Sequence, residues 1–177
     1  MIRKALATLL LAAVSVLAVA QIPQRLELVT IEADIAGNHE RLEVFNMPLD
    51  GVNQYFLSVG HLGIGDEVIQ ILFDPIFELF IPLGGTVAEA QETLQTLMDL
   101  YKEDPGTCIE MPGCLAFPFP DNKREMVKIT RRKVLLSNLL EFSLQREGYI
   151  RATHIQKSNL KSLASGVRFY GKIHPKE

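Results

Sequence analysis

The chain combines stretches in which hydrophobic and polar residues alternate with two stretches of helical periodicity. Residues 26–35 place hydrophobic side chains on one face of an extended chain, and residues 41–47 resume the alternation after Gly37 and Asn38. This pattern predicts a half-buried hairpin. Further strands are expected over 54–59, 68–73 and 77–83, and a glycine-rich loop is expected over 60–67.

The clearest predicted helix spans 86–103. Thr86 and Glu89 form a capping-box pattern at its start, hydrophobic residues then recur at helical spacing, and Pro105 follows its end. A shorter helix is predicted over 159–172, capped by Ser158. An alternative ends this second helix at Gly166 and makes 167–173 a strand.

Three alternating segments, 125–132, 139–146 and 149–156, predict an antiparallel meander, and residues 108–119 predict a short proline-broken hairpin. Strands that are grouped before and after one strong helix favour an α+β fold. We therefore expect a single domain with a mainly antiparallel β-sheet, covered by the amphipathic helix at 86–103 and accompanied by the C-terminal helix at 159–172.

The first twenty residues have the three parts of a secretory signal peptide. Arg3 and Lys4 precede an apolar run over 5–17, and Ala18-Val19-Ala20 forms a small-x-small cleavage site before Gln21. The apolar run is shorter than the ~20 residues of a membrane-spanning helix. The sequence therefore predicts export to the periplasm or the medium, with residues 21–177 as the mature domain and no transmembrane span after cleavage.

Composition excludes a disordered chain, because 47% of the 177 residues are hydrophobic. Charge is divided along the sequence: residues 21–107 have a net charge of −12, and residues 108–177 have a net charge of +7. The halves either neutralise each other within one domain or leave a basic surface for an acidic partner. The densest basic patch contains Lys128, Arg131, Arg132 and Lys133. This patch lacks the interleaved aromatic residues of a nucleic-acid site, so nucleic acid is not an expected partner.

Cys108 and Cys114 are the two cysteines of the chain. A disulfide between them fits an oxidising compartment, provided that their Cα atoms come within about 7 Å; two free thiols are the alternative. Their spacing matches neither a C-x-x-C redox motif nor a zinc pair. The four histidines are scattered, so no metal site and no cofactor is expected.

Two weak catalytic patterns are present. His61 lies in the glycine-rich loop near Asp66 and Glu67, which could supply a base and its orienting carboxylate, although a solvated turn explains the same residues. Ser158 and Lys161 form an S-x-x-K pattern, which resembles the nucleophile motif of penicillin-recognising serine enzymes. The companion elements of that family are absent, and helix capping also explains Ser158.

These observations favour a non-catalytic binding or interaction module that is exported and meets a protein or a small ligand in the cell envelope. A small periplasmic hydrolase that uses the His61 loop or Ser158 and Lys161 is one alternative. An inhibitor or accessory subunit that docks its basic C-terminal half on an acidic partner is another.

Overall fold

The computed structural model describes residues 26–35, 38–48, 52–64, 77–114, 124–146 and 149–175. Within them the chain forms four antiparallel strands and a helix, and then repeats this order. The first unit contains β1 (Leu26–Ile35), β2 (Asn38–Asn46), β3 (Tyr55–Ile64), β4 (Phe77–Gly84) and α2 (Val87–Leu100). The second unit contains β5 (Cys108–Gly113), β6 (Glu125–Val134), β7 (Ser137–Arg146), β8 (Tyr149–Gln156) and α3 (Lys157–Ile173). The predicted single α+β domain is confirmed.

The strands form two four-stranded antiparallel sheets rather than the one sheet expected. Strand β3 joins them, because its first part pairs with β2 and β4 while Gly63 and Ile64 at its end pair with β8. A second link connects β4 to the residue after β5, where Phe80 and Cys114 exchange two backbone hydrogen bonds of 2.9 and 2.8 Å. The two sheets therefore curve into a nearly continuous structure of eight strands.

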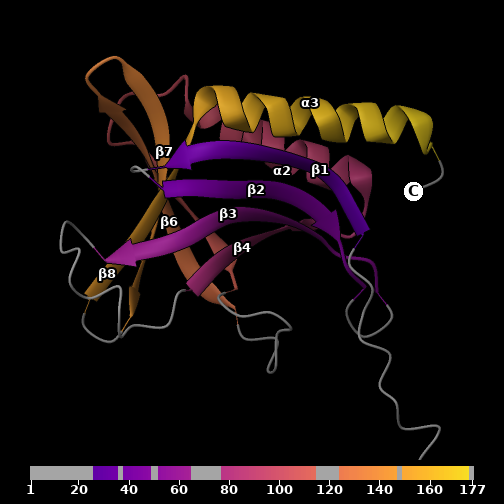
Figure 1. Ribbon diagram of the computed structural model, residues 1–177, viewed down its shortest axis with the longest axis horizontal. Helices are drawn as coiled ribbons and strands as arrows, with labels where there is room; N and C mark the ends of the chain where they lie inside the picture. Colours follow the sequence, from indigo (N-terminus) through magenta and orange to yellow (C-terminus); the bar gives the residue numbers. More distant parts are fainter. Residues whose placement is uncertain are drawn as a thin grey trace, which may run out of the picture.

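Both helices lie on the same side of the strands (Figure 1). Their buried side chains, which include Leu94, Leu97, Leu160 and Leu163, join the inward-facing residues of both sheets in one hydrophobic core. Helix α3 packs against β1 as well as α2, and Gly166 permits this approach, since a Cβ atom there would lie 2.3 Å from the Val29 side chain. The predicted sheet-covering layer thus consists of two helices.

The predicted helix at 86–103 is confirmed as α2. Thr86 is its N-cap, and the Thr86 hydroxyl oxygen accepts a hydrogen bond of 3.2 Å from the backbone N–H of Glu89. The Glu89 carboxylate in turn accepts from the backbone N–H of Gly85 at 2.6 Å. These bonds satisfy N–H groups that a helix start leaves without intrahelical partners.

The C-terminal helix is also confirmed, and the strand alternative for 167–173 is wrong. The predicted cap is wrong as well. Strand β8 passes directly into α3, so Gln156 occupies the N-cap position without a side-chain hydrogen bond. Ser158 lies inside the first turn, where its backbone carbonyl accepts from the Ser162 hydroxyl.

A smaller aromatic cluster lies on the other face of β2, β3 and β4. Phe45 stacks on Phe56 at a centroid distance of 5.5 Å and meets the edge of Phe80 at 5.8 Å. Met47 and Cys114 complete this cluster. The sheet of the first unit is therefore buried on both faces, which explains its long hydrophobic runs.

Several loop expectations require correction. The glycine-rich segment at 60–67 is strand as far as Ile64, because Gly60 adopts a φ of 81° beside a shift in the β3–β4 register and lets the strand continue. Strand β5 pairs with β6 rather than within 108–119, so the predicted short hairpin there is wrong. The predicted signal peptide at 1–20 and the predicted strand at 68–73 lie outside the described residues.

Candidate functional site

The hairpin formed by β6 and β7 ends in a turn made of two leucines. The strands stay in register up to the pair Val134 and Ser137, which leaves Leu135 and Leu136 as the whole connection. Two-residue hairpin loops require left-handed backbone angles and usually contain Gly, Asn or Asp. Leu135 has a φ of 53° and is the one non-glycine residue with positive φ in the described part of the chain. The local sequence therefore holds an unfavourable residue at the most demanding position of the turn.

The two leucines are also the most exposed large hydrophobic residues that the structure describes. Leu135 is 91% exposed, Leu136 is 98% exposed, and neighbouring Val134 is exposed by more than half. A left-handed conformation costs an L-residue roughly 1–2 kcal/mol. Neither burial nor backbone preference explains leucines here, and strained residues of this kind concentrate at functional sites.

The predicted basic patch divides into buried and exposed residues. Arg131 is only 6% exposed. Its guanidinium donates to the Asn138 side-chain oxygen at 2.6 Å, to the carbonyl of Tyr101 at 3.4 Å and to the carbonyl of Arg132. Arg131 therefore ties the base of the hairpin to the end of α2 and is not a surface cation.

Arg132, Glu141 and His154 form a row across the outer face of β6, β7 and β8. Arg132 donates two hydrogen bonds, of 2.9 and 3.2 Å, to one carboxylate oxygen of Glu141, and His154 is the cross-strand partner of Glu141. Burial lowers the pKa of His154, and the negative charge of Glu141 opposes that shift. At neutral pH the row therefore contains one ion pair and a neutral imidazole.

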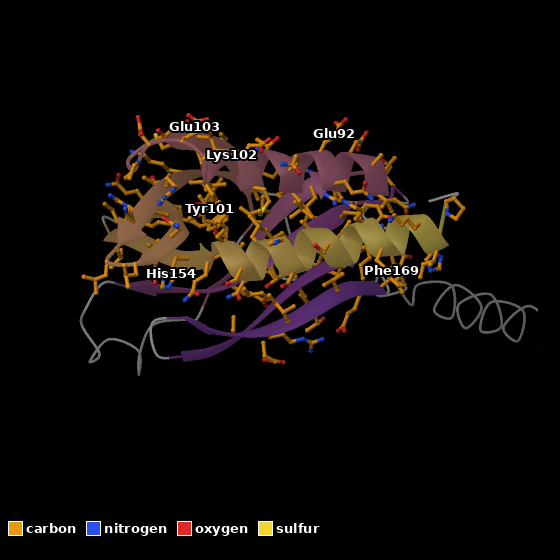
Figure 2. The ribbon with its side chains drawn as sticks, turned by 90° about the horizontal axis from the view of Figure 1, so that it is seen from above. Glu92, Tyr101, Lys102, Glu103, His154 and Phe169 are labelled. Atoms are coloured by element: carbon orange, nitrogen blue, oxygen red, sulfur yellow. The ribbon has the colours of Figure 1, made fainter. Side chains whose placement is uncertain are left out.

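A depression of about 830 Å³ follows this row to the hairpin tip. Its lining is apolar at Val134, Leu135, Leu136 and Leu139 and polar at Arg132, Lys133, Ser137, Glu141, His154 and Gln156. Figure 2 shows His154 near the start of α3, at the end of the domain from which the hairpin extends. We call Val134, Leu135 and Leu136, with the cations Arg132 and Lys133, the hairpin tip.

The histidine pattern does not form a site within the described residues. His61 belongs to β3, where its backbone pairs with Glu78 of β4. Asp66 and Glu67 lie outside the described residues. No group of three His, Cys, Asp or Glu side chains in the described part of the chain is arranged to hold a metal ion.

The S-x-x-K residues lie on the surface of α3. Ser158 and Lys161 are both exposed, and neither lines the depression at the hairpin tip or the groove between the helices. This placement does not provide the enclosed pocket that a serine nucleophile uses. The hydrolase alternative remains a hypothesis without geometric support among the described residues.

Cys108 and Cys114 are free thiols in the structure. Extended strand β5 separates them, and six residues of strand span about 20 Å, far beyond the Cα separation that a disulfide permits. Burial raises the pKa of the Cys114 thiol, and the positive charge of Arg124 opposes this shift. A buried thiol of this kind is unreactive. The geometry therefore matches the free-thiol alternative.

Sequence reasoning missed the hairpin tip. The predicted strands end at 132 and begin again at 139, so 133–138 received no assignment, although its hydrophobic residues are visible in the sequence. It also missed a partly buried polar contact between neighbouring strands β3 and β4, in which the Ser58 hydroxyl donates to the Glu78 carboxylate at 2.5 Å. Ser58 and Glu78 are far apart in sequence, so only the strand register brings them together.

No helix among the described residues is long and apolar enough to cross a membrane. Comparison of the chain with protein-family models, curated proteins and solved structures gives no match. The chemistry of the hairpin tip is therefore the strongest guide to function.

Proposed function

We propose that this protein is an exported, non-catalytic binding module that attaches reversibly to membrane surfaces carrying anionic lipid headgroups. The attachment element is the hairpin tip. The observation that carries the proposal is the pair Leu135 and Leu136, which are 91% and 98% exposed on a turn that disfavours leucine. Export rests on the three-part signal pattern of residues 1–20.

The tip has the amphipathic design of a membrane-inserting loop. Moving an exposed leucine into a nonpolar phase contributes about 1.5–3 kcal/mol, so the two leucines supply about 3–6 kcal/mol. Each nearby cation adds about 1 kcal/mol at an anionic surface. The total is comparable to the binding of one myristoyl chain, which is reversible.

A lipid surface fits the tip better than a protein surface does. A stable protein interface buries about 800 Å² on each partner, and the five residues of the hairpin tip offer much less. A bilayer interface accepts two exposed apolar side chains and supplies phosphates for Lys133 and Arg132. Because Arg132 is already paired with Glu141, Lys133 is the principal headgroup contact.

Fluorescence provides a direct test, because the chain contains no tryptophan. We expect the emission of a Leu136→Trp variant to shift to shorter wavelength with vesicles of phosphatidylglycerol and phosphatidylcholine, and to shift less with phosphatidylcholine alone. Ile150→Trp is the matched control, since Ile150 is exposed on β8 and pairs with Gln145, near the end of β7 that is opposite the tip. Equal shifts at both positions, or no shift at Leu136, would refute attachment through the tip.

A second variant tests the energetics of attachment. Replacing both leucines in Leu135→Ser/Leu136→Ser removes the apolar contribution, and we expect vesicle binding measured by co-sedimentation to fall about a hundredfold or more. The folded state is expected to survive, since both side chains are exposed. Undiminished binding by a folded variant would contradict the proposal, and binding of a protein but not of vesicles would reassign the tip to a protein partner.

A further inference from the structure

The two helices form an exposed layer with opposite charges on its two halves. They run antiparallel and side by side (Figure 2). A Cβ atom at Gly171, near the end of α3, would lie within 3 Å of Gln91 and Val87, near the start of α2. A groove of about 350 Å³, lined by Ala88, Gln91, Glu92, Gln95, Ala164 and Arg168, separates their outer faces.

The α3 half is basic. The helix carries Lys157, Lys161, Arg168 and Lys172, and it contains no acidic residue. At about 100° per residue these four cations fall within a sector of about 60°, so they form one stripe along the outer side of the helix. All four are exposed, and none of them belongs to an ion pair within the described residues.

The α2 half is acidic. Glu92 and Asp99 lie on its outer face, and Glu103 and Asp104 continue the negative charge into the turn that follows. Lys102 is the one cation over 87–104, and its ammonium nitrogen is 2.5 Å from the Asp99 carboxylate. Figure 2 shows Glu92 and Glu103 on α2 and on the turn after it, along the outer edge of the layer.

Ion pairs among the described residues leave this separation of charge intact. Arg41 pairs with Glu27, Lys102 pairs with Asp99, and Arg132 pairs with Glu141, so that each of these pairs joins residues of one sequence half. The acidic row on α2 and the basic stripe on α3 therefore lie next to each other on the exposed side of the helix layer. Such a face is complementary to its own copy.

We propose that the helix layer is the interface of a symmetric dimer formed with a second copy of this chain. A two-fold axis parallel to the helices, above the groove, places α2 of each copy over α3 of the other. The same operation keeps the facing helices antiparallel, so both acidic rows meet basic stripes. Phe169, which is 65% exposed on α3, supplies apolar contact beside the charges.

The area of the helix layer determines the expected affinity of the dimer. Two helices of 14 and 17 residues, each about 10 Å wide, present roughly 500 Å² per copy. This area is below the standard 800 Å² per partner. We therefore expect a weak dimer whose association depends on ionic strength and falls between about 0.1 M and 1 M salt, as the Debye length shrinks from about 10 to 3 Å.

A charge-swap experiment tests this arrangement independently of membrane binding. One variant carries Lys161→Glu and Arg168→Glu, and the other carries Glu92→Lys and Glu103→Lys. All four side chains are exposed, so both variants are expected to fold. Each variant alone faces like charges in the symmetric dimer, and we expect its self-association, measured by sedimentation velocity, to weaken about tenfold or more.

Mixing the two variants restores both complementary contacts. Native mass spectrometry is therefore expected to detect the mixed dimer in preference to either homodimer. Lys128→Glu is the control, because it makes one reversal of the same kind on β6, outside the helix layer, and is expected to leave the dimer unchanged. A wild-type protein that stays monomeric, or variants that associate as the wild type does, would overturn the proposal.

Discussion

Replacing Leu135 by glycine is expected to stabilise the fold while weakening vesicle binding. The φ of 53° places Leu135 in the left-handed region, which costs a leucine roughly 1–2 kcal/mol and glycine almost nothing. Because Leu135 is 91% exposed, the truncation sacrifices little packing. Glycine also increases the conformational entropy of the unfolded chain, which offsets the relief of strain by about 0.5–1 kcal/mol. The net expectation is a stabilisation of about 0.5–1 kcal/mol.

Leu136→Gly is the matched control for this prediction. Leu136 is equally exposed, and its φ is not positive, so glycine relieves no strain there. We expect this control to lose about 0.5–1 kcal/mol, which separates the two glycine variants by about 1–2 kcal/mol. A comparison of this kind also cancels effects that are common to any shortening of the tip.

Urea denaturation followed by circular dichroism measures the difference in stability between the two glycine variants from their unfolding midpoints. Calorimetry provides a second measurement. For a domain of this size, 1 kcal/mol corresponds to about 2–4 °C in Tm. If both glycine variants are destabilised by the same amount, Leu135 stores no strain and the argument for a functional turn fails. If Leu135→Gly is more stable yet binds vesicles as well as the wild type, the strain is real but the leucine is not an attachment residue.

Three further predictions concern the domain itself. Leu97→Ala is expected to lower the free energy of unfolding by about 2–5 kcal/mol in urea titrations, because Leu97 is fully buried between α2 and the sheets; a loss below 1 kcal/mol would place it outside the core. Tyr101→Phe removes the 2.7 Å hydrogen bond to the Ile155 carbonyl and is expected to cost about 1 kcal/mol by the same assay. Burial lowers the pKa of His154 below its unfolded value of 6.5. The free energy of unfolding is therefore expected to reach its full value above about pH 6.5 and to fall as the pH decreases below it. His154→Gln is expected to flatten this part of the urea midpoint–pH profile, and an unchanged profile would contradict the assignment.

Local patterns predicted the elements whose contacts are local. The hydrogen bond between Thr86 and Glu89 connects residues three positions apart, and the pattern of hydrophobic residues after them defines the buried face of α2. The meander was predictable because each of its strands alternates and pairs with its sequence neighbour. The link between β3 and β8 joins residues about ninety positions apart, and nothing in either segment specifies its partner.

The candidate site was only partly predictable, for a related reason. The sequence marked Arg131 as part of a basic surface because charge was counted along the chain. Strand alternation places Arg131 on the same side as Val127 and Ile129, both fully buried, so the period-two pattern contained the correct orientation. The tip was missed because turn prediction relies on Gly, Asn and Asp, and this turn uses two leucines instead.

A dimer formed through the helix layer would bind a membrane through two hairpin tips. The β6–β7 hairpin leaves the domain at the end where α3 begins (Figure 1). A two-fold axis parallel to the helices keeps that end the same in both copies, so a dimer would present two hairpin tips to one surface. The second tip then binds at the high effective concentration that the first one creates. Binding to phosphatidylglycerol vesicles is therefore expected to increase more steeply with protein concentration than a single tip allows.

The charge-swapped variants separate avidity from simple electrostatics. The variant with Lys161→Glu and Arg168→Glu is expected to bind vesicles weakly, and its loss of positive charge alone could explain that result. Adding the variant with Glu92→Lys and Glu103→Lys restores the dimer, and co-sedimentation of the acidic variant is then expected to recover. If the acidic variant stays unbound in a mixture where native mass spectrometry detects the mixed dimer, the dimer does not carry its hairpin tips to the membrane and serves another purpose.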